Sequence, residues 1–316
     1  MPIIIRSGPA TPPPVLPDLP PSYSEPMREW DTRRPQAVYI APDGTEWPLS
    51  APELGWATID DVSGLGAAPV DLITDPHPRY GERVRHVQAQ SRVITWPLGV
   101  WGESHLEFLG RWRSLGRAFA MTRRRGPGRL RIIRPDGTAR EILVYFQGGF
   151  EGVPGMGFTE DVAVVSLFCE DPYFRAVEPL SLRYGTPTSR LFLNPFPSIS
   201  SGRVLGDVMA TNPGETEAWP EWVLTGPMDS FTALSRTLNQ SFTLTYPLAA
   251  GQTIRITTDP PTVRGPSGQP LTYALSWPGS VLWPLEPGLN DVRFTAAGSE
   301  AGTSVELNYW PRFESA

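Results

Sequence analysis

Short apolar stretches separated by turn-forming residues recur along the chain from residue 36 onward. Residues 37–49, AVYIAPDGTEWPL, hold two such stretches around a Pro-Asp-Gly turn, and residues 129–146, RLRIIRPDGTAREILVYF, repeat the arrangement. Proline presets φ at the first turn position, and glycine readily takes the left-handed conformation that a turn requires. The pattern therefore predicts a β-hairpin in each of the two segments.

One segment between these hairpins has the pattern of a helix, from about residue 104 to residue 120. Ser104 and Glu107 have the spacing of a capping box, in which each side chain satisfies a backbone N–H at the start of the helix. The glycines and the proline of residues 126–128 end any continuation. Apolar residues at spacings of three or four predict one buried stripe, formed by Leu106, Leu109, Trp112, Leu115 and Phe119.

An apolar, valine-rich run, DVAVVSLF, occupies residues 161–168. A continuous run of this length predicts a strand that is buried on both faces. The next residues hold the single cysteine of the chain, Cys169, and are expected to end that strand and turn the chain. We predict a domain junction there, formed by Asp171, Pro172, Tyr173 and Phe174.

After Phe174 no helical pattern of useful length appears, and short strands follow one another at a spacing of roughly ten residues. Eight or nine such strands in about 140 residues predict an antiparallel β-sandwich over residues 176–316. The stretches are LSLRY, SRLFL, WPEWVLTG, FTALSRTL, SFTLTY, QTIRITT, LTYALSW, NDVRFTA and TSVELNYW.

The predicted chain is thus mainly β and has three parts. Residues 1–27 carry nine prolines and predict an extended, proline-rich arm. Its PPSY stretch at residues 20–23 matches a WW-domain ligand, although an arm lying on a neighbouring surface is the simpler interpretation. Residues 28–175 are expected to form an α+β N-terminal domain with one helix, followed by the sandwich of residues 176–316.

Composition agrees with two packed domains. The chain is 40% apolar and includes 11 tryptophans and 13 phenylalanines, while 37 prolines and 30 glycines argue against a helical protein. No apolar run approaches the ~18 residues that span a membrane, and the start of the chain has no signal-peptide pattern. A single cysteine excludes an internal disulfide and a cysteine-cluster metal site. We therefore expect a soluble protein made in a reducing cytoplasm.

Positive charge is unevenly distributed along the chain, whose net charge is −6. All 27 basic residues are arginine, and ten of them lie between Arg111 and Arg140 with one acid, Asp136. A protein interface facing an acidic partner is the favoured interpretation, and a solvated face or a nucleic-acid contact are the alternatives. The candidate interface residues are Arg111, Arg113, Arg117, Arg123, Arg124, Arg125 and Arg129.

The usual catalytic motifs do not occur in the sequence, which has no G-x-S-x-G, Walker A, H-E-x-x-H or C-x-x-C stretch. His77, His86 and His105 are not at metal-ligand spacing. Cys169 at the end of an apolar strand is best interpreted as a small core residue, with a reactive thiolate as the alternative. We expect no catalytic residue, cofactor or metal.

Three longer stretches together resemble the siphophage tail-protein family, the distal tail (Dit) proteins of long-tailed phages. The first runs from Trp101 through the second hairpin to DVAVVSLFCEDPYF, where the family has a strand ending in aspartate, proline and an aromatic residue. The second is NPGETEAWPEWVLTGP, residues 212–227, and the third is SWPGSVLWPLEPGLNDVRF, residues 276–294. The resemblance covers about residues 36–310 and leaves out the proline-rich arm.

The resemblance implies a split-barrel-like sheet in the N-terminal domain and a galectin-like C-terminal sandwich. It also implies a six-membered ring that joins the tail tube protein and the end of the tape-measure protein to tip or hub proteins. The protein would then be a non-enzymatic virion component at the distal end of the tail, assembled in the host cytoplasm, without membrane or specific nucleic-acid binding.

A galectin-like sandwich raises a second possible function, carbohydrate or receptor binding in host recognition. Trp219 and Trp222 are the candidates for stacking on a sugar. All three histidines precede residue 106, however, so the sandwich lacks the histidine of the galectin sugar site. Structural packing of both tryptophans is the favoured interpretation.

Overall fold

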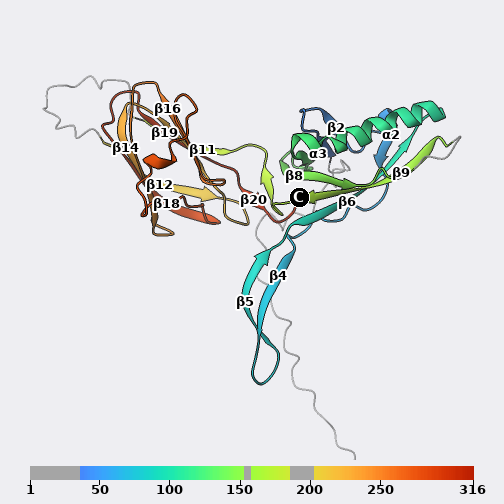
Figure 1. Cartoon of the computed structure of the whole chain (residues 1–316), viewed down its shortest axis with the longest axis horizontal. Helices are drawn as coiled ribbons and strands as arrows, with labels where there is room; N and C mark the ends of the chain where they lie inside the picture. The colour runs from blue at the N-terminus through green and yellow to red at the C-terminus, as the bar shows by residue number, and fades with distance from the viewer. Residues whose placement is uncertain (1–35, 153–157, 186–202) are drawn as a thin grey trace, which may run out of the picture.

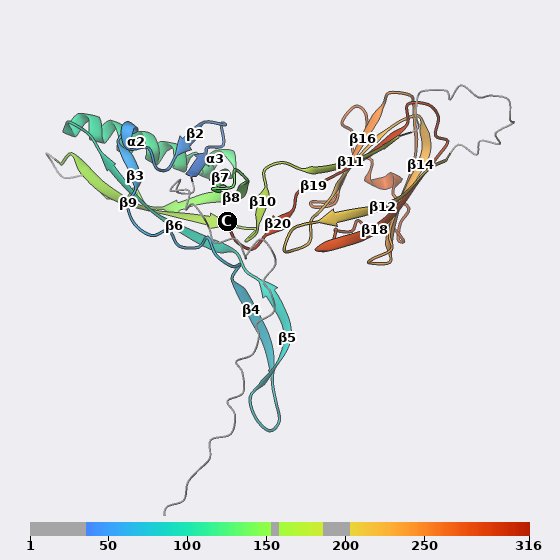
Figure 2. The same cartoon turned by 180° about the vertical axis from the view of Figure 1, so that it is seen from behind.

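The computed structural model describes residues 36–152, 158–185 and 203–316, and it is built mainly of β-strands. The proline-rich arm and the SRLFL stretch lie outside the described residues. Figures 1 and 2 show two bodies side by side: a curled sheet carrying one long helix, and a β-sandwich. Each body has its own cluster of buried apolar residues. The mainly-β prediction is therefore confirmed.

The first body is a curled antiparallel sheet whose path runs β2-β1-β7-β8-β9-β6-β3. Two short strands, β10 (Phe174–Ala176) and β20 (Arg312–Phe313), extend it beside β8. The strands on the path are β2 (Glu46–Pro48), β1 (Gln36–Ile40), β7 (Gly128–Ile133), β8 (Ala139–Gly148), β9 (Glu160–Cys169), β6 (Arg92–Trp101) and β3 (Trp56–Thr58), with a 3-10 turn, η1 (Pro52–Leu54), before β3.

Both predicted Pro-Asp-Gly hairpins are present, as β1–β2 and β7–β8. Gly44 and Gly137 take positive φ values of 87° and 83°, which glycine adopts at little cost. Asp43 accepts a hydrogen bond from the Thr45 backbone N–H, and Asp136 accepts from both the hydroxyl and the N–H of Thr138. These hydrogen bonds lower the pKa of both aspartates, because they stabilise the charged form.

The predicted helix is α2 (His105–Ala120), and the short α3 (Thr122–Arg125) follows it. Ser104 caps α2 by accepting from the Glu107 N–H, while Glu107 reaches back to the N–H of Glu103. The predicted stripe is wrong at its start, because Leu106 is 80% exposed and Phe108 is buried instead. At about 100° per residue, a series of three-residue steps places position 106 about 180° away from position 115. The buried face consists of Phe108, Trp112, Leu115, Ala118 and Phe119.

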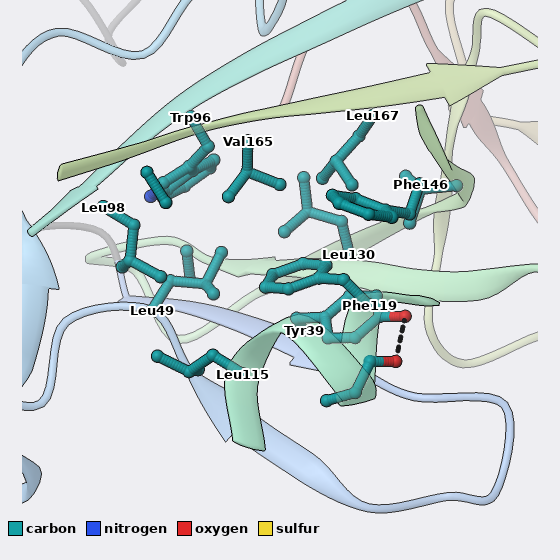
Figure 3. Packing of buried hydrophobic residues seen from close by; sticks show 14 of the residues in the cluster. Tyr39, Leu49, Trp96, Leu98, Leu115, Phe119, Leu130, Phe146, Val165 and Leu167 are labelled. Carbon is teal, nitrogen blue, oxygen red and sulfur yellow. Dashed lines mark hydrogen bonds between the residues drawn. The ribbon is translucent and has the colours of Figure 1, made fainter. Parts of the chain in front are cut away.

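This buried face packs into the concave side of the sheet. Tyr39 and Phe119 stack with their ring centroids 4.2 Å apart, and the Tyr39 hydroxyl donates to the carbonyl oxygen of Ala118 (Figure 3). The core around them takes side chains from β6, β7, β8 and β9, so that Leu98, Leu130 and Leu167 surround the aromatic pair (Figure 3). Residues from several sequence-distant strands thus hold α2 on one face of the sheet.

Strand β9 departs from the prediction of a strand buried on both faces. Ala163, Val165 and Leu167 face the core, but Val162 and Val164 are 47% and 53% exposed. An antiparallel sheet covered on one side leaves its second face open, and here α2 supplies the only helical layer among the described residues. A valine run by itself does not distinguish these two arrangements.

The second body is a sandwich of two antiparallel sheets, as predicted. The LTYALSW stretch, predicted as a strand, instead forms a 3-10 turn, η2 (Thr272–Ala274), so that Leu271 and Leu275 are buried while Tyr273 is exposed. One sheet contains β11 (Leu180–Gly185), β19 (Ser304–Tyr309), β13 (Glu221–Thr225), β16 (Thr253–Thr257) and β17 (Thr262–Arg264), and the other contains β12 (Arg203–Asn212), β18 (Gly288–Ala297), β14 (Met228–Ser235) and β15 (Gln240–Leu248).

The C-terminal end of the predicted sandwich range lies with the first body. Phe313 pairs with Phe174, and Ala316 packs against the first core. The buried Arg92 donates to the carbonyl oxygen of Glu314 at 2.7 Å, and Arg140 donates to that of Ser315 at 2.8 Å. The chain therefore passes from the first body to the sandwich and returns, which joins the two bodies through two neighbouring strands.

Candidate functional site

Cys169 is buried at the end of β9, in the first core. Burial raises the pKa of its thiol to about 12, because a thiolate is poorly solvated there, and the nearby Arg92 guanidinium only partly opposes this effect. A thiol with this pKa holds almost no thiolate near neutral pH, and the thiolate is the reactive form. The position agrees with a packing role for Cys169.

We expect Cys169 to be unreactive in the native protein. At pH 8 a thiol-specific reagent should modify less than about one chain in ten over the time that labels an unfolded chain fully, since both burial and the raised pKa oppose attack. Labelling in buffer and in guanidinium chloride, followed by intact mass, measures the difference. Rapid stoichiometric labelling of the native chain would contradict the structural interpretation.

Two of the three histidines lie on one hairpin and the third begins α2, whereas Cys169 ends β9. His77 follows β4 (Val70–Pro76), His86 lies in β5 (Glu82–Ala89), and His105 begins α2 and contacts the carbonyl oxygen of Phe158 through Nδ1. Within the described ranges, no three His, Cys, Asp or Glu residues come together as a metal site. The described helices also include none that is long and apolar enough to cross a membrane.

The arginines predicted as an interface divide into two groups. Arg111 donates to the carbonyl oxygen of Trp101 and pairs with Glu107, and Arg129 lies 3.9 Å from Glu141, so both serve the first body itself. The second group projects from α2 and α3 into solvent, and it comprises Arg113, Arg117, Arg123, Arg124 and Arg125.

A groove of about 930 Å³ runs beside this second group. Its floor is apolar and includes Trp112, Phe146 and Phe150, whose rings contact one another. Arg123 lies over the Phe146 ring at 5.3 Å, and Arg113 and Arg117 line the groove as well. An apolar floor with cationic edges fits a protein segment that carries both apolar and acidic side chains.

A second exposed surface is apolar and lies on the β4–β5 hairpin, which projects from the first body in Figures 1 and 2. Leu72 pairs across the hairpin with Val87, and each is 53% exposed. Further exposed apolar side chains, Val162 and Val164, lie on the open face of the sheet, toward the start of β9. A two-stranded ribbon with apolar residues in solvent is marginally stable alone, so this surface is suited to packing against another chain.

The junction residues lie where the two bodies meet. Arg312 donates to both carboxylate oxygens of Asp171 at 2.7 Å and stacks over the Tyr173 ring, while Phe174 is buried in the first core. Pro172 is also buried. Asp171 further accepts a hydrogen bond from the Tyr173 N–H, so the turn and the ion pair stabilise the same local geometry.

Two charged side chains at this junction are buried, and no pattern in the sequence around them indicates it. Glu141 is almost fully buried and pairs with Arg175 at 2.8 Å and with Arg131 at 3.6 Å. Arg92 is buried beneath Phe174 and donates to the carbonyl oxygens of Gly64 and Gly66. Their partners are distant in sequence, so only the folded chain brings these groups together.

The two tryptophans considered for sugar stacking do not form an exposed platform. Trp222 is fully buried at the centre of the sandwich core, so its proposed role in sugar stacking is wrong. Trp219 is half-buried and lines a cavity of about 320 Å³ at the junction, together with Asp171 and Arg312. A buried indole cannot present its face to a sugar, which removes half of the predicted site.

A scan against protein-family models finds no match, and a search of curated proteins finds none either. Among solved structures, the chain is similar to the Dit protein of phage SPP1, with a TM-score of 0.63 and 12% identity, over 89% of this chain and 100% of that one. It is also similar to chains of two phage P2 baseplate structures, in activated conformations with calcium and with strontium. Each has a TM-score of 0.53 and 11% identity; the former match covers 89% of this chain and 99% of that chain, and the latter covers 90% and 100%. The chain therefore shares the fold of these phage tail proteins.

Proposed function

We propose that this protein is a structural component of a phage tail tip, a ring-forming hub between the tail tube and the tip or baseplate proteins. The observation that carries the proposal is the fold, shared over nearly the whole length of the SPP1 protein, which is described as a paradigm of the hub of the adsorption apparatus in phages that infect Gram-positive bacteria. Both bodies and their connection are included in that similarity.

The exposed hairpin supports self-association. The β4–β5 surface, together with the open face of β9, holds apolar side chains that a second copy of the chain would cover. Burying apolar area stabilises such a contact by about 25 cal/mol per Å². A head-to-tail contact between identical chains forms a closed ring when the rotation between neighbouring chains brings the last chain back to the first. A six-membered ring is the assembly that the family resemblance implies.

The arginine group on α2 and α3 supports a contact with an acidic partner. Three of its members, Arg113, Arg117 and Arg123, line the groove floored by Trp112 and Phe150. In a ring-forming hub the partners would be the tail tube protein, the end of the tape-measure protein, and the tip or hub proteins. The place of the protein would then be the distal end of the tail, after assembly in the host cytoplasm.

Labelling of purified virions tests the role directly. Gold-conjugated antibody against the chain should decorate the distal end of the tail in electron micrographs. Label confined to the capsid or absent from intact particles would reject the tail-tip assignment. Isolated tails that lack the tip provide the negative control.

Charge reversal of Arg123, Arg124 and Arg125 should impair assembly without unfolding the chain. The three side chains project into solvent, so glutamate at these positions should change the melting temperature little while placing like charges against an acidic partner. The measurements are circular dichroism, chromatography of rings, and complementation of tail assembly. A matched reversal of Arg183 and Arg264, which are exposed on the sandwich, should have no effect. Normal rings and normal tails from the triple variant would show that these three arginines do not form the proposed interface with an acidic partner.

A further inference from the structure

The two bodies are joined by two short connections that lie side by side. Residues 177–179 lead from β10 into β11, and residues 310–311 lead from β19 back to β20. The N–H of Ala176 donates to the carbonyl oxygen of Pro311 at 2.9 Å, so both connections pass the same point of the first body (Figures 1 and 2). Two adjacent tethers leave the bodies free to bend about that point unless a further contact holds them.

A loop of the sandwich, residues 212–217, makes such a contact with β20. One edge of β20 pairs with β10, and the other edge pairs with the loop through a bridge between Thr216 and Arg312. The Glu215 N–H donates to the Arg312 carbonyl oxygen at 2.8 Å, and the Glu314 N–H donates to the Glu215 carboxylate at 2.8 Å. Strand β20 is therefore shared by the two bodies.

The Arg312 side chain spans the same joint. Its guanidinium donates to both carboxylate oxygens of Asp171 at 2.7 Å in the first body, and to the carbonyl oxygen of Glu217 at 3.3 Å in the loop. Hydrogen bonds between charged groups are stronger than those between neutral groups, and this side chain is only 16% exposed. Arg312 thus ties the loop to the first body through both its backbone and its side chain.

Two residues of the loop allow it to approach β20 closely. Asn212 is buried, and its side chain donates to the carbonyl oxygens of Thr216 and Leu285, each at 3.0 Å. The same side chain accepts from the N–H of Gly214 at 2.9 Å, which holds the loop in its turn. A Cβ added at Gly214 would lie 2.6 Å from the Arg312 carbonyl oxygen and 2.8 Å from its backbone nitrogen. Any side chain at this position would therefore push the loop away from β20.

Beside this contact, a cavity of about 320 Å³ lies between the two bodies. Glu141 and Arg175 line it from the first body, and Trp219 and Glu221 line it from the sandwich. The two clusters of buried apolar residues are separate, each within its own body. The joint therefore depends on the polar contacts between β20 and the loop, and interfaces of this polar kind permit relative motion of domains.

We propose that loop 212–217 and Arg312 form a clasp that sets the angle between the two bodies. While the clasp is closed, the sandwich and the first body move as one unit, because they share β20. When the clasp is open, the connections at 177–179 and 310–311 act as a hinge, and the sandwich swings relative to the first body. The clasp lies within one chain and does not depend on the proposed function, although in a ring it would hold every sandwich at the same angle.

Distances between spin labels on the two bodies test the clasp. In a Cys169→Ala background, Leu106→Cys on α2 and Arg264→Cys on β17 provide exposed labelling positions. Labelled chains are diluted with unlabelled ones, so that only distances within one chain are measured, and a closed clasp should give one narrow distribution. Gly214→Val should make this distribution at least about twofold wider, because the bodies then move independently. Gly279→Val is the matched control, since a Cβ there meets no atom within 4 Å.

Arg312→Gln distinguishes an open clasp from a fold defect. It removes the charge that pairs with Asp171, so the label distribution should widen while circular dichroism stays that of the original chain. Arg236→Gln breaks an ion pair with Asp291 within the sandwich and should leave the distribution unchanged. A wider distribution in either folded variant, Gly214→Val or Arg312→Gln, supports the clasp. The original distribution in both would overturn the proposal, and if the valine variant does not fold, the glutamine variant alone decides.

Hydrogen exchange on the full chain tests the clasp without labels. The N–H groups of Glu215 and Glu314 donate across the joint, so Gly214→Val should speed their exchange by about tenfold or more. The amides of β13, residues 221–225, should exchange as in the original protein, which shows that the sandwich stays folded. Unchanged exchange of the Glu215 and Glu314 amides in a folded variant would refute the role of Gly214 in closing the clasp.

Discussion

Replacing Leu72 and Val87 with glutamate is expected to convert rings into folded monomers. The two residues form a cross-strand pair on the β4–β5 hairpin, and both are half exposed in the single chain. In the proposed ring they would be covered by a neighbouring copy, where burial of each side chain contributes about 1.5–3 kcal/mol. Two buried, unpaired carboxylates would cost more than this gain. Because a ring repeats the contact at every interface, we expect essentially complete loss of the assembled form.

Light scattering coupled to size-exclusion chromatography measures the result, and circular dichroism checks the fold. Met209→Glu with Leu289→Glu is the matched control, since both residues are exposed on adjacent sandwich strands. This control should form the same rings as the original chain. An L72E/V87E variant that elutes with the mass of the original assembly would contradict the role of the hairpin. A chain that remains monomeric at all concentrations and in the presence of tail tube protein would contradict ring formation.

Trp222→Ala should destabilise the sandwich more than any exposed substitution. Trp222 is fully buried, and its ring centroid lies 5.5 Å from that of Phe231, 5.7 Å from that of Trp283 and 5.9 Å from that of Phe242. Truncating a buried tryptophan to alanine typically costs about 3–5 kcal/mol, against a typical domain stability of about 5–15 kcal/mol. We expect the sandwich transition to fall by roughly 10 °C, taking about 2–4 °C per kcal/mol.

Thermal and denaturant unfolding, followed by circular dichroism, measure this loss. Trp222→Phe keeps an aromatic ring in the core and should lose less stability, particularly because the Trp222 indole N–H has no hydrogen-bond partner among the described residues. Trp277→Ala should change stability by about 0.5 kcal/mol or less, as exposed substitutions do. A loss below about 1 kcal/mol for Trp222→Ala would mean that the packing around this ring is looser than the structure shows.

Local signals in the sequence predict local structure well here. The Pro-Asp-Gly turns form as expected because proline, aspartate and glycine each satisfy the turn within a few residues. The cap of α2 forms for the same reason, as Ser104 and Glu107 bond neighbouring backbone N–H groups. The spacing places Leu106 on the wrong face because repeated steps of three residues drift around a helix. The LTYALSW stretch forms a 3-10 turn, in which Leu271 and Leu275 are buried and Tyr273 is exposed, whereas a strand would place all three on one face.

The candidate surfaces depend on contacts that sequence spacing does not reveal. Arg129 follows the solvent-facing arginines closely in sequence, yet Glu141 from the next strand lies within ion-pair distance of it. Arg92 looks like an ordinary strand residue, but it is buried and donates to three carbonyl oxygens, those of Gly64, Gly66 and Glu314. Trp219 and Trp222 are three positions apart, and only the second is fully buried. The partners of Arg92 are distant along the chain, and the partner of Arg129 lies across a hairpin.

The sequence by itself determined the β-rich class, the single long helix, the hairpin turns and the change of pattern near Arg175, because periodicity and turn chemistry act over a few residues. The tertiary structure alone decided which face of β9 stays open, which arginines remain available, and where the C-terminal strand returns. These features arise from the curling of a sheet whose neighbouring strands are far apart in sequence. Burial and charge pairing depend on that curling, and no short pattern of residues encodes it.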